Sequence, residues 1–424
     1  MGILEIRRGR APNCSSSGSI IGLALVSSAG ASALLTLWSH RLLQWKSKVR
    51  PETFGAVVQG ENPPGRVFVD SETAGLLGVN ERPSGVPDNA LSAPTEVHVA
   101  LTHKCPVQCS GCYLDASPSG EEAKLAALKI DLDALAEMGV FEVALGGGEA
   151  LLHPEIIDLA QYIRSREMIP NLTISGFGVE RFAPEQLASL FGQINLSIDG
   201  PPDVYKAVRG WKGYALGVRS LRKLAQAGGR VGVNTVLTRP LLSDRNAFFN
   251  FAKDLVDFGM LEWQWLRFKP SGRGAPRYDD FALTRQQREG LLSLALEVEQ
   301  RFNITIRWDC AMFPFLADRG IPVSRLRQLG VLGCTGGERL WARDIDGAFA
   351  PCSFVPSDSS EHSVAERWRA DSTVQAWRQR ASTPPEPCAQ CEYRSLCRGG
   401  CRVVAEYLTG DPLAPDPECP RVMR

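Results

Sequence analysis

Three cysteines lie within eight residues of one another in the stretch CPVQCSGCY. They are Cys105, Cys109 and Cys112, with the spacing C-x3-C-x2-C. A structural zinc ion takes four ligands, so zinc would need a fourth group such as His103. A disulfide would pair two of the thiols and leave the third alone. Three thiolates suit a cuboidal iron–sulfur cluster, because they hold three irons and leave the fourth open to a ligand.

A glycine run that ends in a carboxylate, GGGEA, occupies residues 146–150. It follows the apolar stretch 141–145, which is typical of a strand. Glycines at the end of a strand let the backbone approach a ligand closely, and the carboxylate of Glu149 is suited to receive an ammonium group. A plain turn is the alternative interpretation of such a run.

Seven more cysteines gather between residues 334 and 419. Cys334 is followed by twelve residues, Gly347, four residues and Cys352. The segment 334–424 has few apolar runs with which to build a core, which favours ordering by metal ligation. A zinc ribbon would use C-x2-C pairs in fours, and seven thiols fit that pattern poorly. The remaining five are Cys388, Cys391, Cys397, Cys401 and Cys419.

The composition limits the compartment and the partners. There are 12 cysteines in 424 residues, and a cysteine-poor middle separates the two groups, which favours metal ligation in a reducing compartment over disulfides. Thiolate-bound iron is oxygen-sensitive, so we expect a cytoplasmic protein. The formal net charge of zero argues against nucleic acid as the main partner.

Strand and helix patterns alternate through the middle of the chain. Six strand-then-helix units predict a parallel sheet with right-handed crossovers, in a full or partial barrel. The cysteine triplet and the glycine run both follow strands directly, at the end of a barrel where chemistry is usually found. We therefore predict an α/β protein with a partial (β/α)6 TIM-like barrel, followed by a small irregular iron–sulfur-cluster-binding domain. The expected strands are 96–101, 141–145, 171–175, 194–199, 230–238 and 262–268.

The ends of the barrel set the expected domain boundaries. The leader has a basic start and an uncharged run at 11–39, which fits a start site assigned too far upstream, a signal or anchor, or a flexible tail. Serines in that run argue against membrane association. We expect a leader at 1–45, a small β-β-α unit with its linker at 46–94, the barrel at 95–302, a bridging segment at 303–333 and the cluster domain at 334–424.

The C-x3-C-x2-C spacing after the first barrel strand resembles the signature of the radical S-adenosylmethionine (radical SAM) enzymes. The resemblance implies that the open iron binds the methionine part of S-adenosylmethionine, whose reductive cleavage yields a 5′-deoxyadenosyl radical that abstracts hydrogen from a substrate. It also implies that Gly147, Gly148 and Glu149 bind the methionine amino group.

Four further residues are weaker candidates by the same resemblance. Ser197 and Arg209 would meet the methionine carboxylate, and Ser175 and Asp199 the ribose or the substrate. Capping of the next helix is the alternative role for a strand-end serine or aspartate. The family usually has an aromatic residue just before the third cysteine, over the adenine. Here that place is Gly111, and Tyr113 follows the cysteine instead.

The C-terminal cysteines are similar to the SPASM extension of radical SAM enzymes. The resemblance implies one auxiliary 4Fe–4S cluster on Cys388, Cys391, Cys397 and Cys419. It implies three ligands of a second on Cys334, Cys352 and Cys401, for three clusters in total. Cys310 completes that second set, or its iron stays open to substrate, or Cys310 is a buried apolar thiol.

SPASM enzymes mostly act on peptides or proteins, which favours a maturase that oxidises or cross-links a side chain of a ribosomally made precursor peptide. An anaerobic sulfatase maturase, which forms formylglycine, is the alternative. Such enzymes place an aspartate base where this chain has Ser353. A non-catalytic iron–sulfur or zinc protein is the alternative of another class, and the Gly-Gly-Glu motif argues against it. The expected partners are the peptide and a reducing protein such as flavodoxin or ferredoxin. The unit at 53–76 is either a docking element for the peptide or a simple cap on the barrel.

Overall fold

The computed structural model describes residues 3–5, 47–61, 64–87, 90–317, 319–328, 331–356 and 362–423. It divides into two compact units. One comprises residues 1–92 with 322–331, and the other comprises residues 93–321 with 332–424. The uncharged run at 11–39 lies outside the described residues. Among the residues that are described, no helix is both long enough and apolar enough to cross a membrane.

The first unit is built on a four-stranded antiparallel sheet in the order β1-β4-β3-β2. The two expected strands and the helix after them are present, and the sequence analysis missed the other two strands. The Asp70 side chain caps the helix, because its carboxylate accepts a hydrogen bond from the Thr73 amide at 2.9 Å. The elements are β1 (Ile3–Glu5), β2 (Ser47–Glu52), β3 (Gly55–Glu61), β4 (Pro64–Asp70), α2 (Ser71–Leu76) and α12 (Val323–Gln328).

The second unit contains a nine-stranded sheet in the order β11-β10-β9-β8-β7-β6-β5-β12-β13. Strands β5 to β10 are the six predicted ones, and all are parallel to their neighbours. Strands β11 and β12 extend the parallel sheet at its two ends, which the sequence patterns did not predict. The strands are β5 (Glu96–Thr102), β6 (Glu142–Gly147), β7 (Ile169–Ile174), β8 (Gln193–Ser197), β9 (Val231–Leu237), β10 (Glu262–Arg267), β11 (Thr305–Trp308), β12 (Leu340–Arg343) and β13 (Phe349–Ala350).

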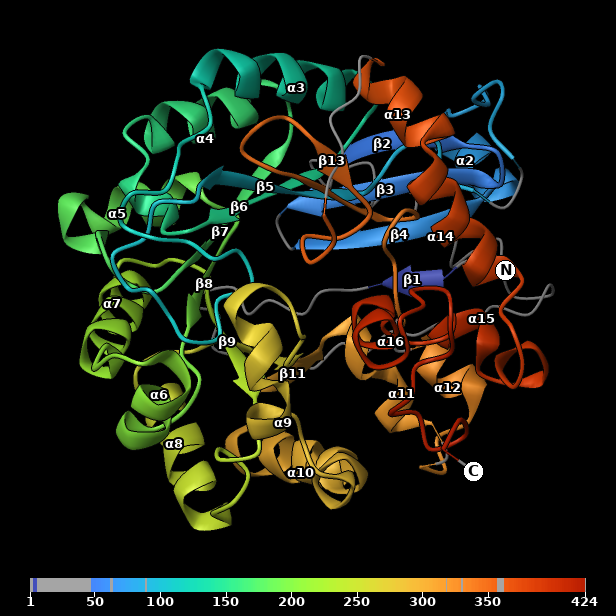
Figure 1. The fold of residues 1–424 in the computed structure, drawn as a ribbon. Helices are drawn as coiled ribbons and strands as arrows, with labels where there is room; N and C mark the ends of the chain where they lie inside the picture. Colours follow the sequence, from blue (N-terminus) through green and yellow to red (C-terminus); the bar gives the residue numbers. More distant parts are fainter. Residues whose placement is uncertain are drawn as a thin grey trace, which may run out of the picture. The chain divides into compact units, whose positions relative to one another are not determined.

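Helices cover the outer face of this curved sheet (Figure 1). The expected helices are all present, and α6 is an additional one that begins at a proline and ends at Gly210 in the left-handed conformation. This arrangement confirms the predicted barrel-type α/β fold. The helices of the unit are α3 (Leu125–Glu137), α4 (Ile156–Ser165), α5 (Pro184–Leu190), α6 (Pro202–Arg209), α7 (Tyr214–Gln226), α8 (Arg245–Asp257), α9 (Tyr278–Phe281), α10 (Arg285–Phe302), α11 (Phe313–Leu316), α13 (Val364–Ala370), α14 (Ser372–Ser382), α15 (Arg394–Cys397) and α16 (Arg402–Thr409).

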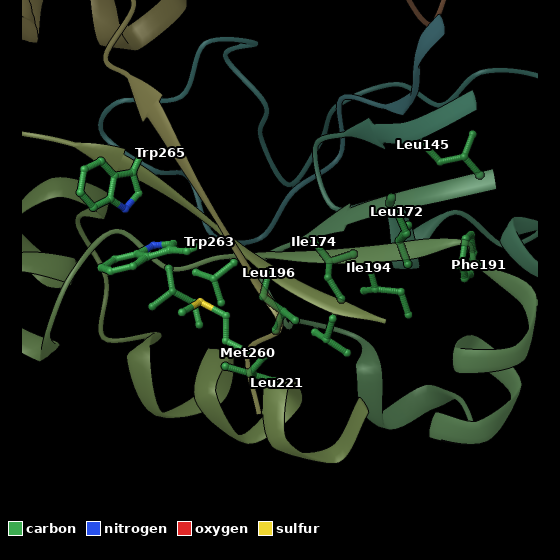
Figure 2. Close-up of a cluster of buried hydrophobic side chains, with 14 of the residues drawn as sticks. Leu145, Leu172, Ile174, Phe191, Ile194, Leu196, Leu221, Met260, Trp263 and Trp265 are labelled. Atoms are coloured by element: carbon green, nitrogen blue, oxygen red, sulfur yellow. The ribbon is translucent and has the colours of Figure 1, made fainter. Parts of the chain in front are cut away.

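The main core lies between the strands and these helices (Figure 2). Trp263 and Trp265 of β10 are fully buried in it, and Trp263 stacks on Phe248 of α8 with ring centres 5.5 Å apart. The alternating tryptophans therefore serve packing and do not line a substrate mouth.

Alternation along each strand leaves a second, polar face to the sheet. On β5 the side chains of Val97, Val99 and Leu101 enter the core, so Glu96 and His98 lie on the opposite face. On that polar face Glu262 of β10 accepts hydrogen bonds from Gln193 and Arg307 at 3.0 and 3.1 Å. Burying polar groups inside a sheet is tolerable only when they are hydrogen-bonded, and this face is built that way.

Candidate active site

The cysteine triplet occupies the loop that follows β5. The loop is tied down by backbone hydrogen bonds from Cys105 to the Ser117 carbonyl at 2.7 Å and from Cys112 to the Cys109 carbonyl at 3.2 Å. Burial raises the pKa of the Cys105 and Cys109 thiols. A buried thiolate needs a compensating positive charge, which ligation to iron supplies.

The segment 270–274, which follows β10, is hydrogen-bonded to the cysteine loop. The guanidinium of Arg273 donates to the Cys109 carbonyl at 3.2 Å and to the Ala116 carbonyl at 2.7 Å. Ser271 donates to the Tyr113 carbonyl at 3.2 Å. No sequence pattern signalled these contacts, because a polar loop rich in glycine looks the same whether it is free or packed.

The Gly-Gly-Glu segment is pressed directly against the backbone of the cysteine loop. The Gly148 amide donates to the Thr102 carbonyl at 2.5 Å, and the Glu149 amide donates to the Lys104 carbonyl at 3.0 Å. A Cβ atom at Gly147 or Gly148 would lie 2.4 Å from a carbonyl oxygen of that loop, and Gly147 has a φ of +111°. Gly147 and Gly148 therefore have to be glycine, because the ends of β5 and β6 approach each other too closely for a Cβ atom. The sequence predicted a close backbone approach at these glycines.

Glu149 is buried and only half satisfied. Its Oε2 accepts hydrogen bonds from the Ser175 amide at 3.0 Å and from the Ser175 hydroxyl. Among the described residues its Oε1 has no hydrogen-bonding partner. Burial raises the pKa of Glu149 to about 7, although the Ser175 hydrogen bonds work in the opposite direction. A buried acceptor without a donor is costly, so this oxygen is positioned to receive one, such as the ammonium of an amino acid.

Ser175, Asp199 and Arg209 are brought to the same region, at the ends of β7 and β8. Arg209 Nε donates to Asp199 Oδ2 at 2.6 Å, and its Nη1 lies 3.7 Å from the Cys109 sulfur. Asp199 Oδ1 accepts the Val236 amide at 2.8 Å. Burial opposes the Arg209 charge, yet Asp199 and Cys109 together raise the pKa of Arg209 above its usual value. Arg209 therefore links the strand ends to the cysteine loop.

Ser197, the last residue of β8, lies beside Asn234 of β9, whose Oδ1 is a buried acceptor without a partner among the described residues. These two residues extend the polar surface away from Glu149. Asn234 was not a candidate on sequence, because an asparagine within a strand carries no signal of its own.

Tyr113 and Gly111 show how the departure from the family pattern is accommodated. A Cβ at Gly111 would lie 3.3 Å from the ring of Phe268, so that aromatic ring already occupies the space beside Gly111. The ring of Tyr113 instead packs on Phe354, with centroids 4.5 Å apart. Phe354 comes two residues after Cys352. Tyr113 thus connects the cysteine loop with the C-terminal cysteine region.

Four C-terminal thiols share one cavity. Cys388, Cys391, Cys397 and Cys419 all line it, together with Tyr393 and Arg421. Arg421 Nη1 lies 3.4 Å from the Cys391 sulfur. These four are the ones that the resemblance assigned to a single auxiliary cluster.

Four other thiols lie close enough to affect one another's ionisation. Burial raises the pKa of Cys310, and the charges of Asp309, Cys334 and Cys352 raise it further. Burial raises the pKa of Cys352 to about 12, and Cys334 and Cys401 add to that shift. Cys310 is therefore near Cys334 and Cys352, two of the three thiols that the resemblance assigned to the second auxiliary set.

Buried ion pairs hold the C-terminal cysteines to the barrel. Arg267 at the end of β10 binds Asp416 at 2.6 and 3.1 Å and Glu418 at 2.7 Å. Asp416 also accepts the Cys401 amide at 2.9 Å. Lys269 forms a second buried pair with Asp309, next to Cys310. None of these residues stood out in the sequence, where charged residues are usually solvated.

As the side chains stand, no group of three or more His, Cys, Asp or Glu in the described part of the chain is arranged to hold a single metal ion. A cuboidal cluster does not require that arrangement, because each thiolate binds a different iron.

The sequence is similar to a known family model and to proteins of known activity. Residues 99–249 match the model of the radical SAM superfamily. A mycofactocin maturase of Mycobacterium tuberculosis is 27% identical over 349 residues, which cover 78% of this chain and 84% of that protein. A PqqA peptide cyclase of Ruegeria pomeroyi is 27% identical over 349 residues, covering 79% and 89% of the two chains.

Solved structures share the fold. Streptococcus suis SuiB, crystallised with its precursor peptide SuiA, has a TM-score of 0.68 at 16% identity, covering 88% of this chain and 98% of that one. The structure of native anSMEcpe with bound AdoMet has a TM-score of 0.60 at 17% identity, covering 77% and 94%.

Residues 99–249 form a radical SAM domain, so the chain is an enzyme of the kind that uses S-adenosylmethionine and a 4Fe–4S cluster. The orphaned Oε1 of Glu149, beside the glycine-tied cysteine loop, fits the amino group of this cofactor.

Proposed function

We propose that this enzyme matures a ribosomally made precursor peptide by oxidising or cross-linking one of its side chains. The named activities of the two relatives above, a mycofactocin maturase and a PqqA peptide cyclase, support a peptide substrate. S-adenosylmethionine supplies, on reduction, the radical that removes a hydrogen atom from the substrate.

The single observation that carries the catalytic part is the free oxygen of Glu149. It is buried, it lies at the end of β6, and its backbone is bonded to the loop of Cys105, Cys109 and Cys112. We assign Glu149, with Gly147 and Gly148, to the methionine amino group. Arg209 and Ser197 are the candidates for its carboxylate, and Ser175 and Asp199 act mainly by positioning Glu149 and Arg209.

The C-terminal thiols are proposed to hold two auxiliary 4Fe–4S clusters. The shared cavity supports one set of four. The mutual electrostatic influence of Cys310, Cys334 and Cys352, and of Cys401 with Cys352, supports a second set of four, with Cys310 as the fourth ligand. Clusters held by these residues would supply an electron acceptor for the oxidation of the substrate radical. A cytoplasmic location and a flavodoxin- or ferredoxin-type donor follow from the need for reduced iron.

Anaerobic reconstitution tests the proposal. We expect about twelve irons per chain, as three 4Fe–4S clusters require. We also expect 5′-deoxyadenosine to form with dithionite, and a synthetic peptide encoded by a short reading frame beside the gene to lose hydrogen. Zinc without iron, or no cleavage of S-adenosylmethionine, would refute an enzyme of this kind. Conversion of a sulfatase-derived cysteine or serine peptide to formylglycine, with no change in the neighbouring peptide, would replace the proposed substrate.

A further inference from the structure

His98 lies on the polar inner face of β5, in a position that packing alone does not explain. Its neighbours on that strand, Val97 and Val99, point into the hydrophobic core, so the imidazole points the other way. The residues paired with it on the two adjacent strands are both alanines, Ala144 on β6 and Ala342 on β12. Small neighbours leave the ring room, and its side chain is 41% exposed.

The two nitrogens of this ring face two different groups. Nδ1 lies 3.0 Å from the hydroxyl oxygen of Ser353, and Nε2 lies 3.3 Å from Oε1 of Glu96. With its proton on Nε2, the imidazole accepts the Ser353 hydroxyl hydrogen at Nδ1, and the Glu96 carboxylate stabilises the cation that forms when Nδ1 gains a proton. Hydroxyl, imidazole and carboxylate in a row make a group that can accept a proton.

Ser353 places this row between the two cysteine regions. It stands between Cys352 and Phe354. Phe354 packs on Tyr113, which follows Cys112. A proton acceptor here is therefore one residue from Cys352 and is connected to the first cysteine loop through the contact between Phe354 and Tyr113. A substrate radical becomes a stronger reductant when it loses a proton. Its oxidation is therefore favoured where a proton acceptor and an electron acceptor lie close together.

We propose that His98, supported by Glu96 and reached through the Ser353 hydroxyl, accepts the proton that the substrate releases during its oxidation. The inference rests on the proposed function. The 5′-deoxyadenosyl radical takes one hydrogen atom from a substrate carbon. A heteroatom of the substrate then gives its proton through the Ser353 hydroxyl to His98 Nδ1 and bonds to that carbon. The remaining electron passes to an oxidised 4Fe–4S cluster, so the peptide loses two hydrogens in all.

The test measures two products in the same reaction of the reconstituted full chain. With S-adenosylmethionine, dithionite and the synthetic peptide described above, the wild type should form 5′-deoxyadenosine and modified peptide in comparable amounts. His98→Asn keeps a polar side chain but cannot take a proton. It should keep 5′-deoxyadenosine formation within about threefold and reduce modified peptide by at least about 100-fold, the range for loss of a general base.

Ser353→Ala should behave like His98→Asn, and Ser353→Asp should recover part of the modified peptide, because a carboxylate also accepts protons. Iron content and the electron paramagnetic resonance spectrum of each reduced variant should equal those of the wild type. His362→Asn, on the exposed segment before α13, is the matched control and should leave both products unchanged.

Several results would overturn the inference. One is an unchanged product ratio in both His98→Asn and Ser353→Ala. Another is an equal loss of both products together with loss of iron, which would mean a structural role. If the wild type itself makes no 5′-deoxyadenosine, the proposed function fails. If the wild type makes modified peptide and the variants do so equally well, only the proton relay fails.

Discussion

The two cysteine regions of this enzyme are held in place by different physical means. The first loop is positioned by close backbone contacts, at Gly147 and Gly148, and ends beside a carboxylate oxygen with no partner among the described residues. The C-terminal region is positioned by buried ion pairs, such as Arg267 with Asp416. The first region therefore keeps an unpartnered acceptor where a ligand can bind, whereas the second is held by pairs between its own charged groups.

The largest effect should come from adding one methyl group to the first region. Gly148→Ala would place a Cβ 2.4 Å from the Lys104 carbonyl oxygen, so the cysteine loop must move. We expect loss of the first cluster, about four irons per chain, and at least about a 100-fold fall in 5′-deoxyadenosine formation. Iron analysis and product assay would measure this. Gly290→Ala, in α10 and outside the site, is the control, since a Cβ there meets no atom within 4 Å. Equal behaviour of the two variants would show that the close contact is unimportant.

Removing one charge from the second region should mainly affect stability. Arg267→Met leaves Asp416 buried without its ion-pair partner and leaves Glu418 paired with Arg288 alone, which costs about 3–5 kcal/mol. We expect a lower thermal midpoint and loss of auxiliary-cluster iron. Arg285→Met removes an exposed pair with Glu289 and should cost under about 1 kcal/mol. A similar loss in both variants would contradict the distinction between buried and exposed pairs.

Binding of the cofactor to the first region should depend on pH. Burial raises the pKa of Glu149 to about 7, so the carboxylate proposed to bind an ammonium is mostly neutral at about pH 6 and mostly charged at about pH 8. Affinity for S-adenosylmethionine should therefore rise about tenfold between those values. Calorimetry at several pH values would measure this. The Glu149→Gln variant should bind weakly at every pH, and the same pH dependence in that variant would assign the titration to another group.

The smallest effect should appear where the two regions meet. Phe354→Leu removes the ring that packs on Tyr113 while keeping apolar volume. The loss of an aromatic pair is worth about 1 kcal/mol, so the thermal midpoint should fall slightly with no change in iron content. Loss of a whole cluster in this variant would mean that the ring pair positions ligands and does more than pack.

Much of the fold followed from periodicity. The strands of the barrel alternate with helices at regular spacing, and both catalytic motifs follow strands, so their convergence at one end was predictable. Residues such as Arg267, Asp416 and Arg273 were not predictable, because a charged side chain in a loop looks solvated until its partner, far along the chain, is known. His98 and Ser353 are 255 positions apart, and no local pattern joins them. Strand β12 was missed because four residues without clear alternation carry little signal.

Because of strand β12, the barrel sheet is complete only when the C-terminal part of the chain has also folded. β12 pairs with β5, the strand that leads to the first cysteine loop, and the Thr95 hydroxyl donates to the Arg339 carbonyl across 244 positions of sequence. A pairing so distant in sequence closes late, because the entropy cost of bringing its ends together precedes any gain. Until it forms, β5 presents an unpaired edge that can associate with other chains. A fragment ending before residue 334 is therefore expected to aggregate, and the barrel does not form a domain that can be separated from its C-terminal extension.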